Sequence, residues 1–209
     1  MTRQRMTALM VVVGLVTAFA GLSGPLAWGT HGPPHTCQNQ TITSVSYQAT
    51  NGDDIIFASV PAVDLIAAGQ GHDNVNIGTG DDYLCGNEGD DVLIGAGGAD
   101  VMNGGSGIDV MDADDSADTV WGGSGDDDLV TGGPGNDVVH GDDGHDDVEG
   151  ADGDDTLTGD AQDDDMFDGR NHDIVHGNAQ TNQDILYRCD TNNDVFGIEL
   201  KLGPDTFYC

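Results

Sequence analysis

The sequence predicts an all-β protein, a parallel β-roll (β-solenoid) of about sixteen nine-residue units with a cap at each end. Three observations lead to this fold class. A period of nine residues runs through residues 49–196, aspartate recurs at one position of the unit, and an apolar residue recurs two positions later. A fixed short period is the sign of a stacked repeat architecture, in which each unit buries its apolar face only against its neighbours.

The aspartate defines the phase of the repeat. Units are numbered from Ala49 as positions 1 to 9, with insertions at Ala58, at Thr131 and at 177–178. Aspartate is favoured in turns generally, but that preference does not explain a fixed place in the unit. Position 6 is Asn193 in the last unit and otherwise reads Asp54, Asp64, Asp73, Asp82, Asp91, Asp100, Asp109, Asp118, Asp127, Asp137, Asp146, Asp155, Asp164, Asp173 and Asp184.

Position 8 is apolar in every unit, including Leu129 in the ninth, and predicts the core. Positions 1 to 6 are rich in Gly and Asp, which tolerate the strained backbone of tight turns. Each unit is therefore expected to be a turn followed by a three-residue strand at positions 7 to 9, with position 8 facing inward. Two units make one coil of eighteen residues, so sixteen units make eight coils. Strands of successive coils then pair in parallel about 4.8 Å apart.

Three units come closest to a known pattern: GGSGIDVMD (104–112), GGSGDDDLV (122–130) and GGPGNDVVH (132–140). They resemble the RTX (hemolysin-type) nonapeptide G-G-x-G-x-D-x-U-x. The resemblance implies a calcium-binding parallel β-roll. Family members carry their protease, lipase or toxin modules outside the repeats, and here only a leader and short caps lie outside. The family's usual export uses an uncleaved C-terminal signal, whereas this chain has an N-terminal leader.

The repeat places the position-6 aspartates in two ladders, one for each turn of the coil. Carboxylates one strand spacing apart repel by about 1 kcal/mol per pair in water, and by more at partly buried sites. Calcium suits this gap because it takes about six to eight oxygen ligands, including backbone carbonyls, whereas Mg²⁺ demands a tighter octahedron. We expect several Ca²⁺ ions and a chain that is largely unfolded without them. The expected ligands are Asp73, Asp82, Asp91, Asp100, Asp109, Asp118, Asp127, Asp137, Asp146, Asp155, Asp164 and Asp173.

Positions 4 and 5 refine this expectation. Position 5 holds aspartate in some units but alanine, isoleucine or histidine in others, so its aspartates (Asp81, Asp90, Asp126 and Asp154) are interpreted as ordinary turn formers. Position 4 is glycine in most units. Ser116 replaces that glycine inside the rod, which predicts a weaker calcium site there.

Residues 1–29 are typical of a secretory signal peptide. Arg3 and Arg5 precede the uncharged run 8–20, which is too short to span a bilayer comfortably. Cleavage after Gly29 and cleavage after Ala20 both satisfy the small-x-small rule, and we favour Gly29. The protein is expected to be secreted or extracellular, without stable membrane insertion. Its net charge of −33 argues against a nucleic-acid partner.

The remaining segments are interpreted as caps. Residues 30–48 form an N-terminal lead-in, 49–196 the repeats, and 197–209 a C-terminal cap, since the end units of a solenoid must be shielded. Four cysteines allow three pairings, and oxidation is favoured outside the cell. We favour the pairs Cys37 with Cys85 and Cys189 with Cys209.

No catalytic arrangement is identifiable in the sequence. The patterns G-x-S-x-G and H-E-x-x-H and a phosphate loop do not occur. No two histidines of the repeats share a position on adjacent coils, so no zinc site is predicted there, and His31 with His35 is the remaining candidate for copper or zinc. Phe167 and Tyr187 share position 9 on neighbouring coils, either beneath the C-terminal cap or as a partner-binding patch.

The sequence therefore predicts a secreted, non-enzymatic calcium-binding repeat protein. It is expected to fold on binding Ca²⁺ and to act as a structural or adhesive module toward a cell-surface, glycan or matrix partner. Two alternatives stay open: a calcium-dependent protein that binds a glycan or ice, and a non-catalytic repeat relative of a secreted RTX enzyme or toxin. Position 3 carries no regular array of Thr and Asn, which disfavours ice.

Overall fold

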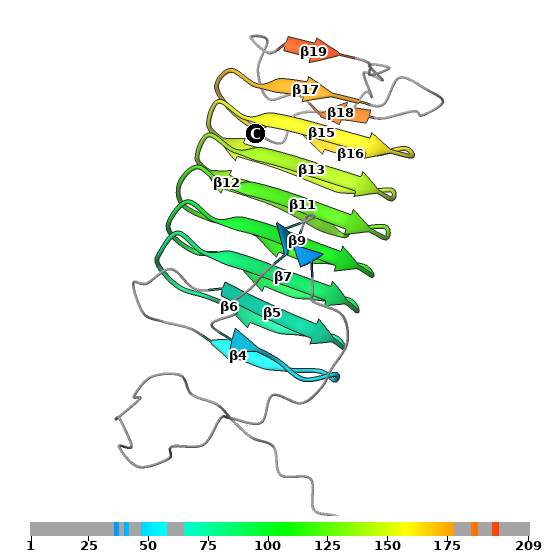
Figure 1. The fold of residues 1–209 in the computed structure, drawn as a ribbon. Coiled ribbons are helices and arrows are strands. Elements are labelled where there is room, and N and C mark those ends of the chain that lie inside the picture. Colours follow the sequence, from blue (N-terminus) through cyan, green and yellow to red (C-terminus); the bar gives the residue numbers. More distant parts are fainter. Residues whose placement is uncertain are drawn as a thin grey trace, which may run out of the picture.

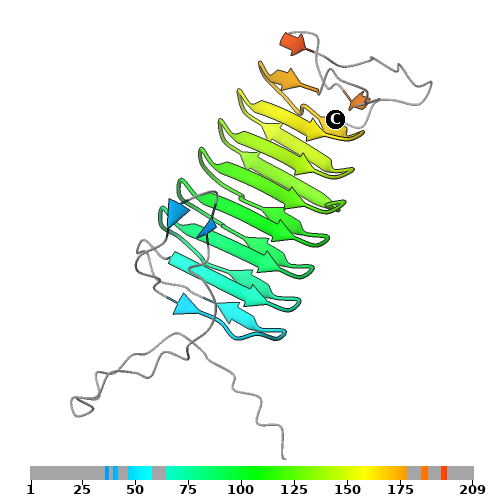
Figure 2. The ribbon, with the colours of Figure 1, turned by 45° about the vertical axis from the view of Figure 1, so that its right-hand side comes forward.

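The chain winds into a solenoid whose two walls are parallel β-sheets (Figures 1 and 2). The computed structural model describes residues 36–37, 40–41, 47–57, 65–177, 185–187 and 194–196. Every regular element in these residues is a β-strand, and none of them belongs to a helix that is long and apolar enough to cross a membrane. This architecture confirms the predicted all-β parallel roll.

Consecutive strands of the repeat lie in opposite sheets, so the chain passes from one wall to the other at every turn. The eight-stranded sheet contains β4 (Ile55–Phe57), β6 (Asn74–Asn76), β8 (Val92–Ile94), β10 (Val110–Asp112), β12 (Leu129–Pro134), β14 (Asp147–Asp152), β16 (Asp165–Phe167) and β18 (Ile185–Tyr187). The nine-stranded sheet contains β3 (Tyr47–Gln48), β5 (Leu65–Gln70), β7 (Tyr83–Glu88), β9 (Val101–Ser106), β11 (Thr119–Ser124), β13 (Val138–Asp143), β15 (Thr156–Ala161), β17 (Ile174–His176) and β19 (Asp194–Phe196).

Each strand pairs with its equivalents one coil away. Met111 of β10, for example, lies opposite Leu93 of β8 and Val130 of β12. Likewise Phe167 lies opposite Tyr187, which confirms that these two residues stand on neighbouring coils. The solenoid makes about seven turns, whereas sixteen units predict eight coils. Segments 58–64, 178–184 and 188–193, toward the two ends of the repeat region, are outside the described residues.

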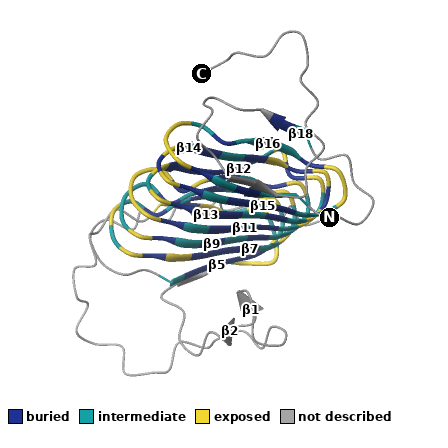
Figure 3. Cartoon of the chain, turned by 90° about the horizontal axis from the view of Figure 1, so that it is seen from above, coloured by how far each residue is buried: buried dark blue, intermediate teal, exposed yellow. Residues whose placement is uncertain are grey.

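The core lies between the two sheets, where position 8 supplies most of it, as predicted, and Ala68, Ile77 and Ala113 at position 1 add to it. Figure 3 shows buried residues along the strands of both sheets. Burying an aliphatic side chain of this size stabilises the fold by about 1.5–3 kcal/mol, and the stack repeats this gain coil after coil. The inward side chains are at most 5% exposed and comprise Ile56, Ile66, Val75, Leu84, Leu93, Met102, Met111, Val120, Val130, Val139, Val148, Leu157, Met166, Val175 and Leu186.

The ninth unit differs from the sequence alignment, which places Leu129 in the core and treats Thr131 as the insertion. The structure buries Val130 and leaves Leu129 half-buried, because the extra residue is Asp128, in front of the strand. A one-residue shift inside the strand would turn every following side chain to the other face. Accommodating the extra residue before the strand, as a bulge, keeps the alternation in phase.

Three short strands precede the first coil. β3 pairs with β5 and extends the nine-stranded sheet beyond the first coil, while β1 (Thr36–Cys37) pairs with β2 (Gln40–Thr41) and contacts β7. Cys85 on β7 is buried and disulfide-bonded. Cys37 as its partner stays a prediction. The signal peptide and the C-terminal cap that the sequence predicts lie outside the described residues, as do Cys189 and Cys209.

Candidate calcium-binding ladders

From Gly69 to Gly169, each turn passes through a left-handed residue at position 2. This backbone costs an L-amino acid about 1–2 kcal/mol, yet Ala96 and Asp142 adopt it with φ of 74° and 72°. The turns are held by their neighbours. For example, the position-4 amide of Gly107 donates to the carbonyl of Ser124 in the next coil over 2.9 Å. The turn shape is therefore imposed by stacking rather than by glycine alone.

The position-6 aspartates follow these turns in two ladders inside the rod. The first ladder is Asp54, Asp73, Asp91, Asp109, Asp127, Asp146 and Asp164, and the second is Asp82, Asp100, Asp118, Asp137, Asp155 and Asp173. The structure brings all twelve predicted residues, Asp73 through Asp173, to the interior with at most 2% of their surface exposed. Asp54, at the edge, is only partly buried.

One carboxylate oxygen of each rung is used in a hydrogen bond to the preceding coil. The amide of Asp91 donates to Oδ1 of Asp109, and the amide of Asp109 donates to Oδ1 of Asp127, both over 2.8 Å. The second ladder repeats the pattern, with the amide of Asp100 donating to Oδ1 of Asp118 over 2.7 Å. The bonds continue along both ladders. Each aspartate thus joins two coils.

The second oxygen, Oδ2, is buried as well. Among the described residues, it accepts no hydrogen bond in Asp73, Asp91, Asp100, Asp109, Asp118, Asp127, Asp137, Asp146 and Asp155. A buried carboxylate oxygen that lacks a donor is costly.

Burial has a direct electrostatic consequence. Desolvation raises the pKa of Asp109 to about 7 and that of Asp100 to about 6, against the lowering effect of the amide hydrogen bond. The described part of the chain holds a single Lys or Arg, Arg170, which pairs with exposed Asp152 over 3.3 Å. Hence no lysine or arginine in that part of the chain neutralises the ladders. Without a bound cation, the carboxylates must take up protons to lose their charge.

Because glycine has no side chain, a glycine at position 1 leaves space beside Oδ2 of the position-6 aspartate in the same unit. A Cβ added to Gly104 would meet Oδ2 of Asp109 and, at 2.5 Å, the carbonyl oxygen of Gly122 in the next coil. The same pair of oxygens recurs at Gly86 and at Gly122. Carboxylate and carbonyl oxygens from two coils therefore converge without a nitrogen or sulfur donor. This is the donor set that calcium takes, at about 2.3–2.6 Å, so the residues present fit that ion.

Position-5 side chains serve a different purpose. Oδ1 of Asp90 accepts a hydrogen bond from the amide of Ile108 over 2.9 Å, and Oδ1 of Asp81 accepts one from Ala99 over 3.0 Å. These aspartates are exposed, and their bonds tie the outside of one turn to the next. Position 5 is thus solvent-exposed, as interpreted, but Asp81 and Asp90 join neighbouring coils rather than closing their own turns.

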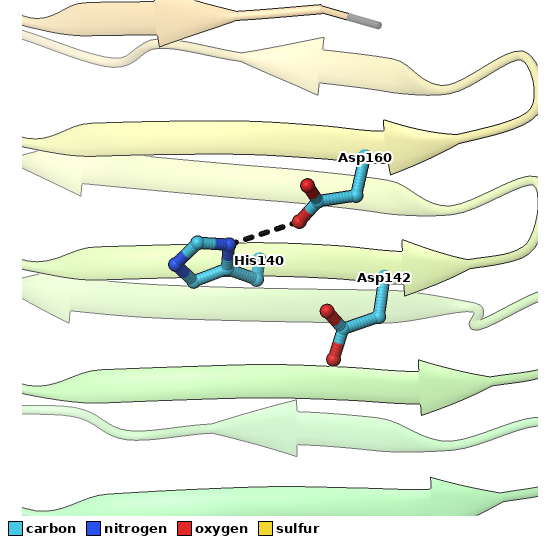
Figure 4. Close-up of side chains that lie close together, drawn as sticks. All are labelled: His140, Asp142 and Asp160. Carbon is cyan, nitrogen blue, oxygen red and sulfur yellow. Dashed lines mark hydrogen bonds and ion pairs between the residues drawn. The ribbon is translucent and has the colours of Figure 1, made fainter. Parts of the chain in front are cut away.

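A further cluster was not predicted from the sequence. His140 and Asp142 of β13 and Asp160 of β15 bring one ligand atom each within 4.8 Å of one another (Figure 4). Nδ1 of His140 lies 2.9 Å from Oδ2 of Asp160, a hydrogen bond that raises the pKa of His140, and Trp121 stacks on the imidazole. The sequence reasoning compared histidines at equal positions, whereas this cluster combines position 9 with position 2. Aspartate at position 2 of two neighbouring coils, where the preceding strands β7, β9 and β11 carry asparagine or glycine, was the available signal.

Comparison with known proteins agrees with the geometry. A family model described as the RTX calcium-binding nonapeptide repeat (4 copies) matches residues 63–84, 76–111, 94–129, 127–157 and 149–183. These matches cover more than half of the chain and include all twelve predicted ligands, Asp73 through Asp173 at position 6. No curated protein matches the sequence. The chain belongs to the family of RTX calcium-binding nonapeptide repeat proteins.

Proposed function

We propose that the two aspartate ladders hold several Ca²⁺ ions and that the chain folds on binding them. The twelve buried aspartates at position 6, Asp73 through Asp173, would supply one carboxylate oxygen each, and the glycine-rich turns would supply carbonyl oxygens. A single observation carries this proposal: buried Oδ2 atoms face carbonyl oxygens of the next coil, and no Lys or Arg of the described residues is available to neutralise them.

The same observation explains why metal and fold belong to one equilibrium. The carboxylates come together only when coils stack, and stacked coils without a cation confine many negative charges to a dry interior. Bound calcium would supply the missing positive charge and would join neighbouring coils, so the free energy of binding becomes free energy of folding. Magnesium is expected to substitute poorly, because it holds its water and demands a smaller octahedron.

A calcium titration of the full chain tests the proposal. Far-UV circular dichroism at neutral pH should show a mainly unfolded chain in chelator and a cooperative gain of β-sheet as free Ca²⁺ rises, with little gain at equal Mg²⁺. A chain that is already fully folded in excess chelator at neutral pH would contradict the proposal.

A matched pair of variants locates the ions. Asp109→Asn keeps an oxygen that can accept from the amide of Asp91 but removes the buried charge. Asp90→Asn makes the same chemical change at an exposed position of the preceding coil on the same side. Asp109→Asn should raise the calcium midpoint by roughly tenfold, the equivalent of about 1.4 kcal/mol, whereas Asp90→Asn should shift it by less than about twofold. Equal midpoints would mean that the ladders do not bind the ions.

For the biological role, we propose a secreted, non-enzymatic module that calcium stiffens into a rod for a structural or adhesive task at a cell surface or matrix. The repeats that the family model matches extend across 63–183, which leaves the two outer walls as the main surface for a partner. Pull-down from cell-envelope material should be calcium-dependent if the folded walls bind a partner. Recovery of the same material in chelator would contradict this role.

Secretion and the cysteine pairs have separate tests. N-terminal sequencing of exported protein should begin near Thr30, and a membrane fraction that retains Met1 would contradict cleavage. Non-reducing peptide mapping should link Cys37 to Cys85 and Cys189 to Cys209. Four free thiols in the exported protein would contradict the proposed caps.

A further inference from the structure

We propose that His140, Asp142 and Asp160 form a binding site for one zinc ion on the outer wall of the nine-stranded sheet, distinct from the interior ladders. The three residues are half-buried, and their ligand atoms all lie within 4.8 Å of one another. Nδ1 of His140 lies 2.9 Å from Oδ2 of Asp160 (Figure 4). Ligands of a tetrahedral zinc ion bind at about 2.0–2.2 Å, so only small side-chain rotations are needed to surround the ion.

The cluster is built by the register of the sheet. β13 pairs with β15 so that Asp142 lies opposite Asp160, and β13 places His140 two residues before Asp142 on the outer side. On the preceding strand, β11, the residue that pairs with Asp142 is Gly123. The pair of carboxylates therefore has no equivalent on β11. The coil stack thus creates a combination of one imidazole and two carboxylates.

The imidazole is already held in place. Trp121 of β11 stacks on it with ring centroids 5.9 Å apart and ring planes 11° apart, on the side away from β15. A ring fixed by an aromatic neighbour loses little freedom when it ligates a metal. Trp121 acts as a positioning residue in this arrangement, and it also provides a fluorescent reporter beside the site.

The donor set distinguishes zinc from calcium. Calcium takes oxygen ligands, whereas zinc accepts imidazole nitrogen together with carboxylate oxygen. Two carboxylates and one histidine leave a fourth position for water, as in other three-ligand zinc sites. Since Arg170, the one arginine of the described residues, pairs with Asp152, no described lysine or arginine competes for the two carboxylates.

The site must depend on the fold, because its ligands come from two coils. It rests on the proposed function only in that calcium is needed to stack those coils. Zinc should bind the calcium-loaded chain and not the calcium-free unfolded chain. By thermodynamic reciprocity, bound zinc should lower the calcium concentration at which the chain folds.

The test is isothermal titration of ZnCl₂ into the full chain at saturating calcium. The wild type should bind one zinc ion that depends on His140. His140→Ala and Asp160→Asn should each weaken binding by roughly 100-fold or more, since even the loss of a residue that only supports a ligand costs about 10- to 100-fold. His72→Ala is the matched control, because His72 contacts Asp90 at 3.4 Å but no third ligand among the described residues joins that pair, and it should leave this affinity unchanged.

Circular dichroism in calcium checks that every variant folds, which separates loss of the zinc site from failure of the calcium-dependent fold. The fluorescence of Trp121 should change on zinc addition in the wild type and in His72→Ala, but not in His140→Ala. Zinc should also lower the calcium midpoint of the wild type and not that of His140→Ala. Equal zinc affinity of wild type and His140→Ala, or equal affinity of the calcium-free and calcium-loaded chains, would overturn the proposal.

Discussion

The two aspartate ladders have the same pattern of carboxylates and hydrogen bonds, but they differ in which units carry glycine at positions 1 and 4. In the first ladder, position 1 is glycine in five successive rungs: Gly86, Gly104, Gly122, Gly141 and Gly159. In the second ladder the series reads Ile77, Gly95, Ala113, Gly132, Gly150 and Asp168. The eighth unit, which has Ala113 at position 1, also differs at position 4, where Ser116 stands in place of glycine. The first ladder is therefore continuous through the middle of the rod and the second is interrupted there.

This difference shows that the aspartate alone does not define a site. Asp118 is as buried as Asp109, and burial raises the pKa of both to about 7. At six of the position-1 glycines, the place of a Cβ lies against Oδ2 and a carbonyl oxygen of the next coil: Gly86, Gly95, Gly104, Gly122, Gly141 and Gly150. In the eighth unit, the methyl group of Ala113 takes that place by the equivalence of the repeats. We therefore expect the two ladders to have similar affinity for protons but different affinity for calcium.

Acidification should have the largest effect, because it acts on both ladders at once. The folded pKa values of about 6 to 7 lie above the usual 3.8, so the folded chain binds more protons than the unfolded chain. Without calcium, the folded state is then most stable below about pH 4 and loses stability as pH rises toward 7. Circular dichroism in chelator should show β-sheet at pH 4 that disappears by neutral pH.

Calcium should respond in the opposite direction, since only the ionised carboxylate binds it well. The calcium midpoint should therefore rise as pH falls below about 7. If the calcium-free chain instead loses β-sheet on acidification, desolvation is not what raises these pKa values.

Removal of one rung should distinguish the ladders. Asp109→Ala deletes a ligand and leaves the amide of Asp91 without its acceptor, a loss of about 1–3 kcal/mol before any metal is counted. The calcium midpoint should rise by roughly tenfold or more. Asp118→Ala leaves the amide of Asp100 in the same state but removes a weaker calcium site, so its shift should be smaller. Asp54→Ala, at the edge, should shift the midpoint least.

Cooperativity supplies a second measure of the same comparison. A solenoid transmits stability through nearest neighbours, so Asp109→Ala should also broaden the titration. Equal midpoints for Asp109→Ala and Asp118→Ala would show that the glycine difference is irrelevant to calcium.

An exchange of alanine and glycine at position 1 tests whether the space beside Oδ2 matters for calcium binding. Gly104→Ala places a methyl group against Oδ2 of Asp109 and should destabilise the calcium-loaded fold by about 1–3 kcal/mol, as overpacking does. Ala113→Gly should lower the calcium midpoint, although glycine costs about 0.5–1 kcal/mol of chain entropy. Chemical denaturation in saturating calcium measures the first change, and a calcium titration measures the second. A higher midpoint for Ala113→Gly would reject the role of position 1.

The smallest effect is expected at position 4 of the same unit. Ser116 has φ of 109°, a backbone region that favours glycine, so Ser116→Gly should stabilise the folded chain by roughly 1 kcal/mol. Ser124→Gly, at position 3 with no positive φ, is the control and should give no gain. Thermal unfolding in calcium separates the two, and equal melting temperatures would contradict the expectation.

Much of the fold was predictable because the period alone sets the phase of the strands. The inward row from Ile56 to Leu186 follows from position 8, and the exception at Leu129 arose because an inserted residue has no local signal of its place. Either Asp128 or Thr131 satisfies the spacing. Only the pairing of Val130 with Met111 decides between them.

The interior ladders were predictable for the same reason, whereas the outer cluster was not. A ladder joins equal positions of successive coils, which a sequence alignment shows directly. His140 and Asp160 occupy different positions of the repeat. They meet because the side chain at position 9 on β13 reaches across to position 2, near the C-terminal end of β15. The upward pKa shifts also depend on burial that composition does not show, since exposed Asp90 and buried Asp91 are neighbours in the sequence.

The amide-to-carboxylate bonds along the ladders all run in one direction. The amide of each aspartate donates to the carboxylate of the coil that follows it in the chain, never to the coil before. The rod therefore has a direction: among the described residues of the ladders, each carboxylate accepts from the coil before it and each amide donates to the coil after it. A coil of a chain that emerges with its N-terminus first cannot complete these bonds until the next coil has emerged. Assembly is thus ordered in time as well as in space, and the last segment to emerge decides when the turns before it can close.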